Sequence, residues 1–206
     1  NKLLSGWAKY PQIAAKVQSP KKLEQINFNS KKGIIARGNG RSYGDSSINN
    51  ANTADMLNFR KIISFDEVKG IINVESGVML EDILNFCVKK NWFPPVSPGT
   101  KFVTVGGMLA CDVHGKNHHN KGSFSNFVKE FKIIDTNKKI KICNRYKNIK
   151  LFKDTIGGMG LTGIITEVKF QLIKIQTPFV KQKVSNYFKL KDLMRRFEKN
   201  NKEEYS

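Results

Sequence analysis

Short apolar runs alternate with glycine-rich or polar connections along most of this chain, a pattern typical of a protein built from short strands. Two apolar runs separated by only a few polar residues favour an antiparallel hairpin. The predicted strands are 33–36, 62–65, 70–74, 127–135, 139–143 and 164–175, of which the second and third, and the fourth and fifth, form hairpins.

Apolar residues recur at helical spacing in fewer segments than they form short strand-like runs. Apolar residues at positions 80, 83, 84, 87 and 88 recur with the period of a helix, so 79–88 is predicted to be helical. Ser19 and Pro20 predict the N-cap and first turn of a short helix. Residues 188–202 predict a lysine-rich helix. Short strands combined with few helices indicate the α+β fold class.

A glycine-rich loop follows the first of these strands. Residues 33–48 read Gly-Ile-Ile-Ala-Arg-Gly-Asn-Gly-Arg-Ser-Tyr-Gly-Asp-Ser-Ser-Ile. Glycine lets backbone N–H groups come close to a ligand, and consecutive N–H groups form a concave anion site. The spacing matches neither a P-loop nor a Rossmann fingerprint, because the residues after the loop are turn-like rather than helical. The loop therefore predicts either a phosphate site or a glycine-rich hairpin without a ligand.

Two further glycine-rich segments favour the ligand. Residues 97–119 contain all three histidines of the chain, His114, His118 and His119, within six positions. Residues 155–166 contain four glycines before an apolar strand. Three such loops beside apolar runs suit one extended ligand that is touched at several points.

The three segments resemble the FAD-binding domain of the PCMH type, found in the vanillyl-alcohol oxidase superfamily. Within that superfamily, the string His-Gly-Lys-Asn-His-His at 114–119 resembles the corresponding segment of the oxidases of decaprenylphosphoryl-ribose. The resemblance extends from Trp7 to Leu172, and the matching strings are 36–45, 97–100, 104–107, 110–119, 122–124 and 157–165.

The resemblance implies a fold of two small α+β subdomains with the flavin between them. We expect the FAD-binding domain at 1–175, with subdomains at about 1–76 and 77–175 and a boundary near 76–80. Residues 176–206 are expected to begin a truncated or incomplete substrate domain, because the composition shifts near Gln176.

The resemblance also implies which residues bind FAD. Arg41 stands where relatives with covalent flavin carry histidine, and arginine cannot form that bond, so noncovalent FAD is expected. The implied cofactor-binding residues are Ala36, Arg37, Gly38, Asn39, Gly40, Arg41, Ser42, Tyr43, Gly44, Asp45, Ser46, Gly99, Thr104, Val105, Gly106, Gly107, Cys111, Asp112, Val113, His114, Gly163, Ile164 and Ile165.

His114 is the implied catalytic residue, placed near the flavin ring and the substrate hydroxyl. A core histidine and a metal ligand shared with His118 are the alternatives, although Gly115 disfavours the helix that a His-x3-His site needs. Lys116, Asn117 and His118 are expected to contact substrate or to hold the loop. No metal site is expected.

The net charge and the cysteine spacing bear on which partners and metal sites the chain could have. The net charge of +19 indicates either attraction to anions or a coding bias toward Lys, Asn and Ile, and we favour the bias for most of the charge. The lysines are spread along the chain rather than gathered in one stripe, so a nucleic-acid partner is not expected. Cys87, Cys111 and Cys143 form no Cys-x-x-Cys motif, so neither a zinc ribbon nor a disulfide scaffold is implied. The expected location is the cytoplasm or a membrane periphery, with the periplasm left open.

The resemblance implies FAD-dependent oxidation of a secondary hydroxyl of a sugar, the 2′-hydroxyl of a polyprenyl-phosphate ribose, in the synthesis of cell-wall arabinan precursors. It also implies a lipid-linked or small-molecule substrate and a reductase subunit that completes an epimerisation. Two alternatives stay open at this point. One is an oxidase of free alditols or sugar lactones, and the other is a noncatalytic, basic nucleotide-binding module.

Overall fold

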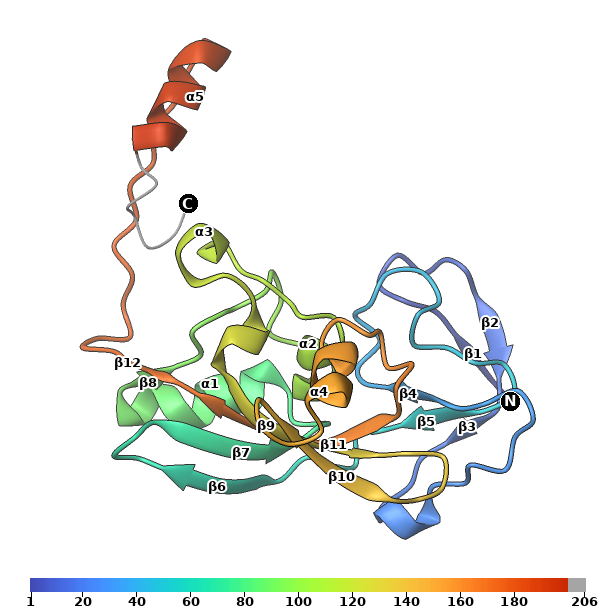
Figure 1. Cartoon of the computed structure of the whole chain (residues 1–206). Helices are drawn as coiled ribbons and strands as arrows, with labels where there is room; N and C mark the ends of the chain where they lie inside the picture. Colours follow the sequence, from blue (N-terminus) through green and yellow to red (C-terminus); the bar gives the residue numbers. More distant parts are fainter. Residues whose placement is uncertain (200–206) are drawn as a thin grey trace.

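The computed structural model describes residues 1–199, in which two sheets form most of the framework (Figure 1). A small parallel sheet has the strand order β3-β5-β4, and a larger antiparallel sheet has the order β10-β9-β11-β7-β6. The strands of the parallel sheet are β3 (Val17–Gln18), β4 (Ile35–Arg37) and β5 (Thr53–Asp55). Those of the antiparallel sheet are β6 (Ile62–Asp66), β7 (Ile71–Glu75), β9 (Val128–Ile134), β10 (Ile140–Asn144) and β11 (Ile164–Gln171).

Two short antiparallel strand pairs and several helices complete the described fold. The strand pairs are β1 (Lys2–Leu4) with β2 (Ile13–Ala15), and β8 (Trp92–Phe93) with β12 (Ile173–Lys174). The α-helices are α1 (Leu80–Cys87), α2 (Val105–Ala110), α3 (His118–Lys121), α4 (Ile149–Thr155) and α5 (Leu190–Lys199). The 3₁₀ helices are η1 (Leu23–Gln25), η2 (Val88–Lys90) and η3 (Phe124–Phe127).

The main core lies between the antiparallel sheet and helices α1, α2 and α4. Alternate residues of β7, such as Ile72 and Val74, are completely buried, while their sequence neighbours are partly exposed. Ile83 of α1 and Leu109 of α2 pack into the same cluster. The period-2 pattern of the strands and the period of α1 therefore direct one apolar face of each element into this core.

Most of the predicted elements are confirmed. The helix at 79–88 is α1, and the two hairpins are β6–β7 and β9–β10. The long strand predicted at 164–175 is divided into β11 and β12. The predicted helix start at Ser19 is wrong, because the Gln25 side chain accepts hydrogen bonds from the N–H groups of Lys21 and Lys22 and the turn begins after Lys22.

The strands on either side of the expected boundary at 76–80 share one sheet. β6 and β7 precede this point, yet β7 pairs with β11 along its whole length. The chain passes from the parallel to the antiparallel sheet between β5 and β6 instead.

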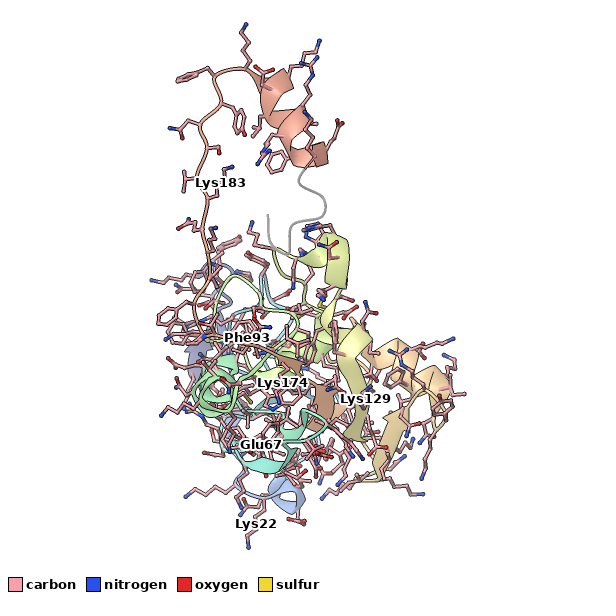
Figure 2. All side chains as sticks on the ribbon, turned by 90° about the vertical axis from the view of Figure 1, so that its left-hand side faces the viewer. Lys22, Glu67, Phe93, Lys129, Lys174 and Lys183 are labelled. Atoms are coloured by element: carbon pink, nitrogen blue, oxygen red, sulfur yellow. The ribbon has the colours of Figure 1, made fainter. Side chains whose placement is uncertain are left out.

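The end of the described chain leaves the two-sheet body. Residues after β12 run outward to α5, which stands apart from the rest of the molecule (Figure 1), and the end of the helix predicted at 188–202 lies outside the described residues. Lys22, Lys129 and Lys183 lie on well-separated parts of the molecule (Figure 2), as expected from lysines spread along the sequence. No helix among residues 1–199 is long and apolar enough to cross a membrane.

Candidate functional site

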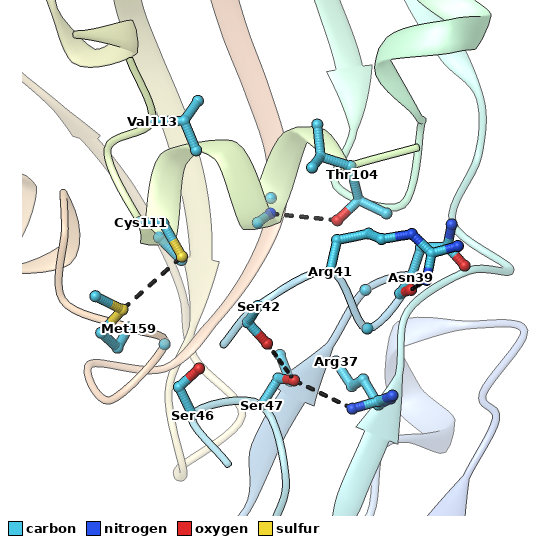
Figure 3. Close-up of a pocket in the computed structure, with 18 of the residues that line it drawn as sticks. Arg37, Asn39, Arg41, Ser42, Ser46, Ser47, Thr104, Cys111, Val113 and Met159 are labelled. Carbon is cyan, nitrogen blue, oxygen red and sulfur yellow. Dashed lines mark hydrogen bonds between the residues drawn. The ribbon is translucent and has the colours of Figure 1, made fainter. Parts of the chain in front are cut away.

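A cavity of about 620 Å³ opens where the three glycine-rich segments meet (Figure 3). The loop after β4, the segment that leads into α2, and the loop before β11 each contribute to its wall. The volume falls within the range of small-molecule and cofactor sites. The three segments therefore line one cavity, and the single ligand expected there stays a prediction at this point.

The glycine-rich loop offers free backbone donors to this cavity. Gly40 has φ of +62° and Gly44 has φ of +57°, conformations in which a side chain would be strained. Within residues 1–199, the backbone N–H groups of the segment 38–43 donate to no protein acceptor. Unpaired N–H groups around a positive-φ glycine form the concave arrangement that binds anions.

Two arginines place positive charge beside this loop. Arg37 donates to Ser47 Oγ at 3.2 Å and to the Ser5 carbonyl at 2.7 Å. Burial lowers the pKa of the Arg37 guanidinium, the carboxylate of Asp55 opposes this effect, and the charge of Arg41 adds to it. A bound anion near the two arginines would offset the effect of burial on the Arg37 guanidinium, because an opposite charge favours the charged form of the group.

Arg41 has unused hydrogen-bonding capacity at the same place. Its Nη1 donates to the Asn39 carbonyl at 3.2 Å, but its buried Nε has no partner in the described part of the chain. A buried donor without a partner costs free energy comparable to a lost hydrogen bond. The Oγ of Ser76, which also lines the cavity, is likewise buried without a partner.

Helix α2 is fixed against the connection between β7 and α1. Thr104 is its N-cap and accepts a hydrogen bond from the Gly107 N–H. The N–H groups of Val105 and Gly106 donate to the carbonyls of Val78 and Ser76, both at 2.8 Å. The first N–H groups of α2 are therefore already satisfied, and the helix contributes shape rather than anion donors to the cavity.

The third segment forms the side of the cavity opposite the arginines. Gly163 and Ile165 line it just before and within β11, and Met159 lies 3.8 Å from the sulfur of Cys111 (Figure 3). Cys111 is exposed as a residue, yet partial desolvation by the surrounding wall raises the pKa of its thiol, which favours the neutral form. The cavity thus combines a cationic, donor-rich loop with an apolar wall.

Most of the predicted cofactor-binding residues line this cavity. They are Ala36, Arg37, Gly38, Asn39, Gly40, Arg41, Ser42, Tyr43, Ser46, Gly99, Thr104, Gly106, Gly107, Cys111, Val113, Gly163 and Ile165.

Six of the predicted cofactor-binding residues do not line it: Gly44, Asp45, Val105, Asp112, His114 and Ile164. Val105 and Ile164 point into the two apolar clusters, where both are almost completely buried. Gly44 and Asp45 are exposed at the outer end of the glycine-rich loop. At the start of β11, alternation of side chains explains why Ile164 faces the core while Gly163 and Ile165 line the cavity.

Asp112 has a clear structural role instead. Its carboxylate accepts hydrogen bonds from the hydroxyl of Ser123 at 2.8 Å and from the N–H and hydroxyl of Ser125 at 2.9 and 3.1 Å. Its φ of +41° is unusual for a residue other than glycine. The three bonds hold the start of η3 and keep the carboxylate away from the cavity.

The histidine segment forms an exposed loop beyond the cavity wall. His114 is exposed and forms an isolated bridge with Ser123, and its ring lies 5.3 Å from the ring of His118. Lys116 and His118 are also exposed, and His118 Nδ1 lies 3.1 Å from the Gly115 carbonyl. Among residues 1–199, no group of three or more His, Cys, Asp or Glu side chains could hold a metal ion.

Asn117 differs from its neighbours because it is completely buried. Its Nδ2 donates to the Pro95 carbonyl at 2.9 Å, which ties the histidine loop to the proline-rich segment. This bond holds the loop, one of the two roles predicted for Asn117, and contact of Asn117 with substrate stays a prediction. His114, Lys116 and His118 remain available to a ligand that extends beyond the cavity.

The sequence reasoning missed several residues of the cavity wall. Pro98, Thr100, Met159 and Gly160 lie within the quoted motifs and could have been included on that ground. Ser47, Val103 and Ala110 lie within or beside the glycine-rich and histidine segments but were not singled out, and the remaining three carry no motif signal: Trp7, Met56 and Ser76.

The fold and the cavity define a flavin-binding domain. The model of the FAD binding domain family matches residues 12–144, and the chain belongs to this family. The cofactor is therefore FAD, and the α+β prediction is confirmed. Membership of the FAD-binding family also argues against the alternative of a basic module that binds a nucleotide other than FAD.

The curated relatives of this chain include two oxidases. Residues of this chain are 35% identical to decaprenylphosphoryl-beta-D-ribose oxidase of Mycolicibacterium smegmatis over 187 residues, covering 86% of this chain and 41% of that protein. They are 23% identical to a putative D-arabinono-1,4-lactone oxidase of Neurospora crassa, covering 79% of this chain and 29% of that protein. The chain thus spans less than half the length of these relatives.

The fold is shared with solved structures of low sequence identity. The BBE-like 1 protein of Physcomitrella patens superposes with a TM-score of 0.69 at 21% identity, covering 77% of this chain and 36% of that protein. This likeness concerns the fold alone.

The residues of the cavity fit FAD. A dinucleotide carries a pyrophosphate, which suits the two arginines and the free N–H groups of the glycine-rich loop. Its ring systems suit the apolar wall that Val103, Val113 and Ile165 provide. The buried Nε of Arg41 and Oγ of Ser76 add polar atoms that lack protein partners.

Proposed function

We propose that this chain provides the FAD-binding part of an oxidoreductase that oxidises a secondary hydroxyl of a sugar, the 2′-hydroxyl of a polyprenyl-phosphate-linked ribose. The observation that carries the proposal is the 35% identity to decaprenylphosphoryl-beta-D-ribose oxidase over 86% of the chain. Within the string at 114–119, which is specific within the resemblance, His114, Lys116 and His118 are exposed.

FAD, when bound, supplies the group that accepts hydride from the carbon bearing the hydroxyl. The residues of this chain bind the cofactor and orient it relative to the substrate. The loop after β4 and the two arginines bind the negatively charged pyrophosphate of the cofactor. The apolar wall around Val103 and Ile165 keeps water from the ring systems of the cofactor. His114 is proposed to contact the substrate hydroxyl, with Lys116 and His118 beside it for the substrate phosphate. The general base is proposed to lie in a substrate domain beyond this chain.

The proposed substrate also suggests partners and a location. A lipid-linked sugar would bring the protein to a membrane surface, where its net charge of +19 favours anionic headgroups. We include in the proposal a reductase that returns the oxidised carbon to the opposite configuration, which completes an epimerisation. The location proposed is cytoplasmic or peripheral to a membrane, with the periplasm open.

A substrate panel tests the proposal. The protein in a form that includes the substrate domain is mixed without oxygen with a polyprenyl-phosphate ribose, a free alditol and a sugar lactone, and the loss of visible flavin absorbance is followed. Reduction by the lipid-linked sugar alone is expected. Faster reduction by the lactone would favour the second candidate, to which the similarity to a putative D-arabinono-1,4-lactone oxidase points.

A further inference from the structure

The segment at residues 5–7, before the first residue matched by the family model, is built onto the glycine-rich loop. The Trp7 N–H donates to the Ser42 carbonyl at 2.8 Å. Gly6 lies so close to the loop that a side chain there would overlap the carbonyl oxygens of Ser42 and Gly44. Contact at this distance requires glycine at position 6 and fixes the segment against the loop.

The same segment holds both arginines of the site. The Ser5 carbonyl accepts the 2.7 Å hydrogen bond from Arg37 Nη2. The guanidinium of Arg41 lies over the indole of Trp7, 5.3 Å from the ring centroid. A cation–π contact orients a guanidinium while leaving its N–H donors available. Those donors include the buried Arg41 Nε that has no protein partner.

Trp7 itself forms part of the cavity wall. Trp7 is among the residues that line the cavity, its ring lies beneath the guanidinium of Arg41, and 55% of the residue is exposed. A large aromatic side chain left half-exposed beside a cavity offers apolar surface that a ligand can cover. In Figure 1 the N-terminal strands β1 and β2 lie on the same side of the molecule as β4 and β5, so the segment reaches the loop directly.

We propose that Trp7 is a cofactor-binding residue and that residues 5–7 position Arg37 and Arg41 for FAD. The segment then acts as a fourth binding element beside the three glycine-rich loops. The proposal depends on FAD as the cofactor and is independent of which sugar is oxidised.

Oxidative footprinting of the wild-type chain tests the contact directly. FAD-free and FAD-loaded protein are exposed to hydroxyl radicals, and oxidation is measured residue by residue by mass spectrometry. We expect FAD to reduce oxidation of Trp7 several-fold and to leave Tyr10 unchanged. Tyr10 is 80% exposed in the same part of the chain and does not line the cavity, so it is an internal control. Equal oxidation of Trp7 in both forms would overturn the proposal.

Affinity measurements separate a binding role from a packing role. Trp7→Ala is expected to weaken FAD binding by about tenfold, the change that about 1.4 kcal/mol of binding free energy produces. Trp7→Phe keeps an aromatic face for Arg41 and should restore most of the affinity, while Tyr10→Ala should match the wild type. The melting temperature of the FAD-free protein should be similar in all four. Unchanged FAD affinity in Trp7→Ala, or a loss explained by a lower melting temperature of the FAD-free form, would contradict the assignment.

Discussion

Gly38 packs directly against the side chain of Thr104: a methyl group added to Gly38 would overlap the threonine hydroxyl. This contact joins the glycine-rich loop to the N-cap of α2. Asn39 strengthens the junction by donating to the Phe102 carbonyl at 2.9 Å. Two motifs far apart in the sequence therefore form one continuous wall of the FAD cavity.

The Gly38→Ala variant should disturb this junction. The added methyl group must displace Thr104, and overpacking of this kind typically costs about 1–3 kcal/mol. We expect a lower FAD affinity and a lower melting temperature, measured by flavin fluorescence titration and thermal unfolding. The double variant Gly38→Ala/Thr104→Ala removes the hydroxyl and should recover part of the FAD affinity. No recovery in the double variant would show that the junction acts through another contact.

Gly40→Val should abolish FAD binding. The φ of +62° at Gly40 is strained for a β-branched residue, and the side chain would overlap the Arg37 guanidinium. The ratio of flavin to protein absorbance after purification measures the loss. Lys139→Ala on the surface is the control and should keep wild-type occupancy. Equal occupancy in the two variants would disprove the assignment of the loop as a phosphate site.

Asp112→Ala should destabilise the protein without a specific effect on FAD. The carboxylate accepts three hydrogen bonds from Ser123 and Ser125, and a bond to a charged group contributes about 1.5–3 kcal/mol. We expect a lower denaturant midpoint in FAD-free protein, with FAD affinity close to wild type wherever the variant is folded. A large loss of affinity with unchanged stability would instead support the cofactor contact expected from the sequence.

Much of the fold could be predicted because its signals are local. The apolar period of α1 and the paired runs of β6–β7 and β9–β10 depend only on neighbouring residues. The glycine-rich loops were found for a similar reason, since close backbone approach leaves a visible composition. The sheet that β6 and β7 join was not predicted, because pairing of β7 with β11 is a contact between distant segments.

The site residues that the sequence did not predict were missed for the same physical reason, because their position depends on contacts between distant segments. Ser76 and Trp7 line the cavity through tertiary packing, and no local motif marks a serine at a strand end or a tryptophan before the first matched residue. Asn117 and Asp112 lie inside a motif but are used to hold loops. Spacing identifies a segment as functional, but it does not identify which of its side chains face the ligand.

FAD is predicted to be noncovalently bound. Arg41 stands at the position where the resemblance places histidine in relatives with covalent flavin, and its guanidinium lies over Trp7. Precipitation of the purified protein with acid should release the yellow colour into the supernatant. Flavin that stays in the precipitated protein after washing would disprove this prediction and would direct attention to another nucleophile in the chain.

The final prediction separates His114 from the cofactor-binding residues. His114 is exposed and lies outside the cavity lining, so His114→Ala should retain FAD. If His114 orients the substrate hydroxyl or stabilises charge during oxidation, its loss should slow flavin reduction by about 10²–10⁴, the range typical of a positioned acid–base group. Rapid-mixing absorbance without oxygen, with the substrate domain present and Lys139→Ala as control, measures this rate. A wild-type rate in His114→Ala would leave His114 as a loop residue paired with His118, and zinc in the purified wild-type protein would instead support the metal alternative.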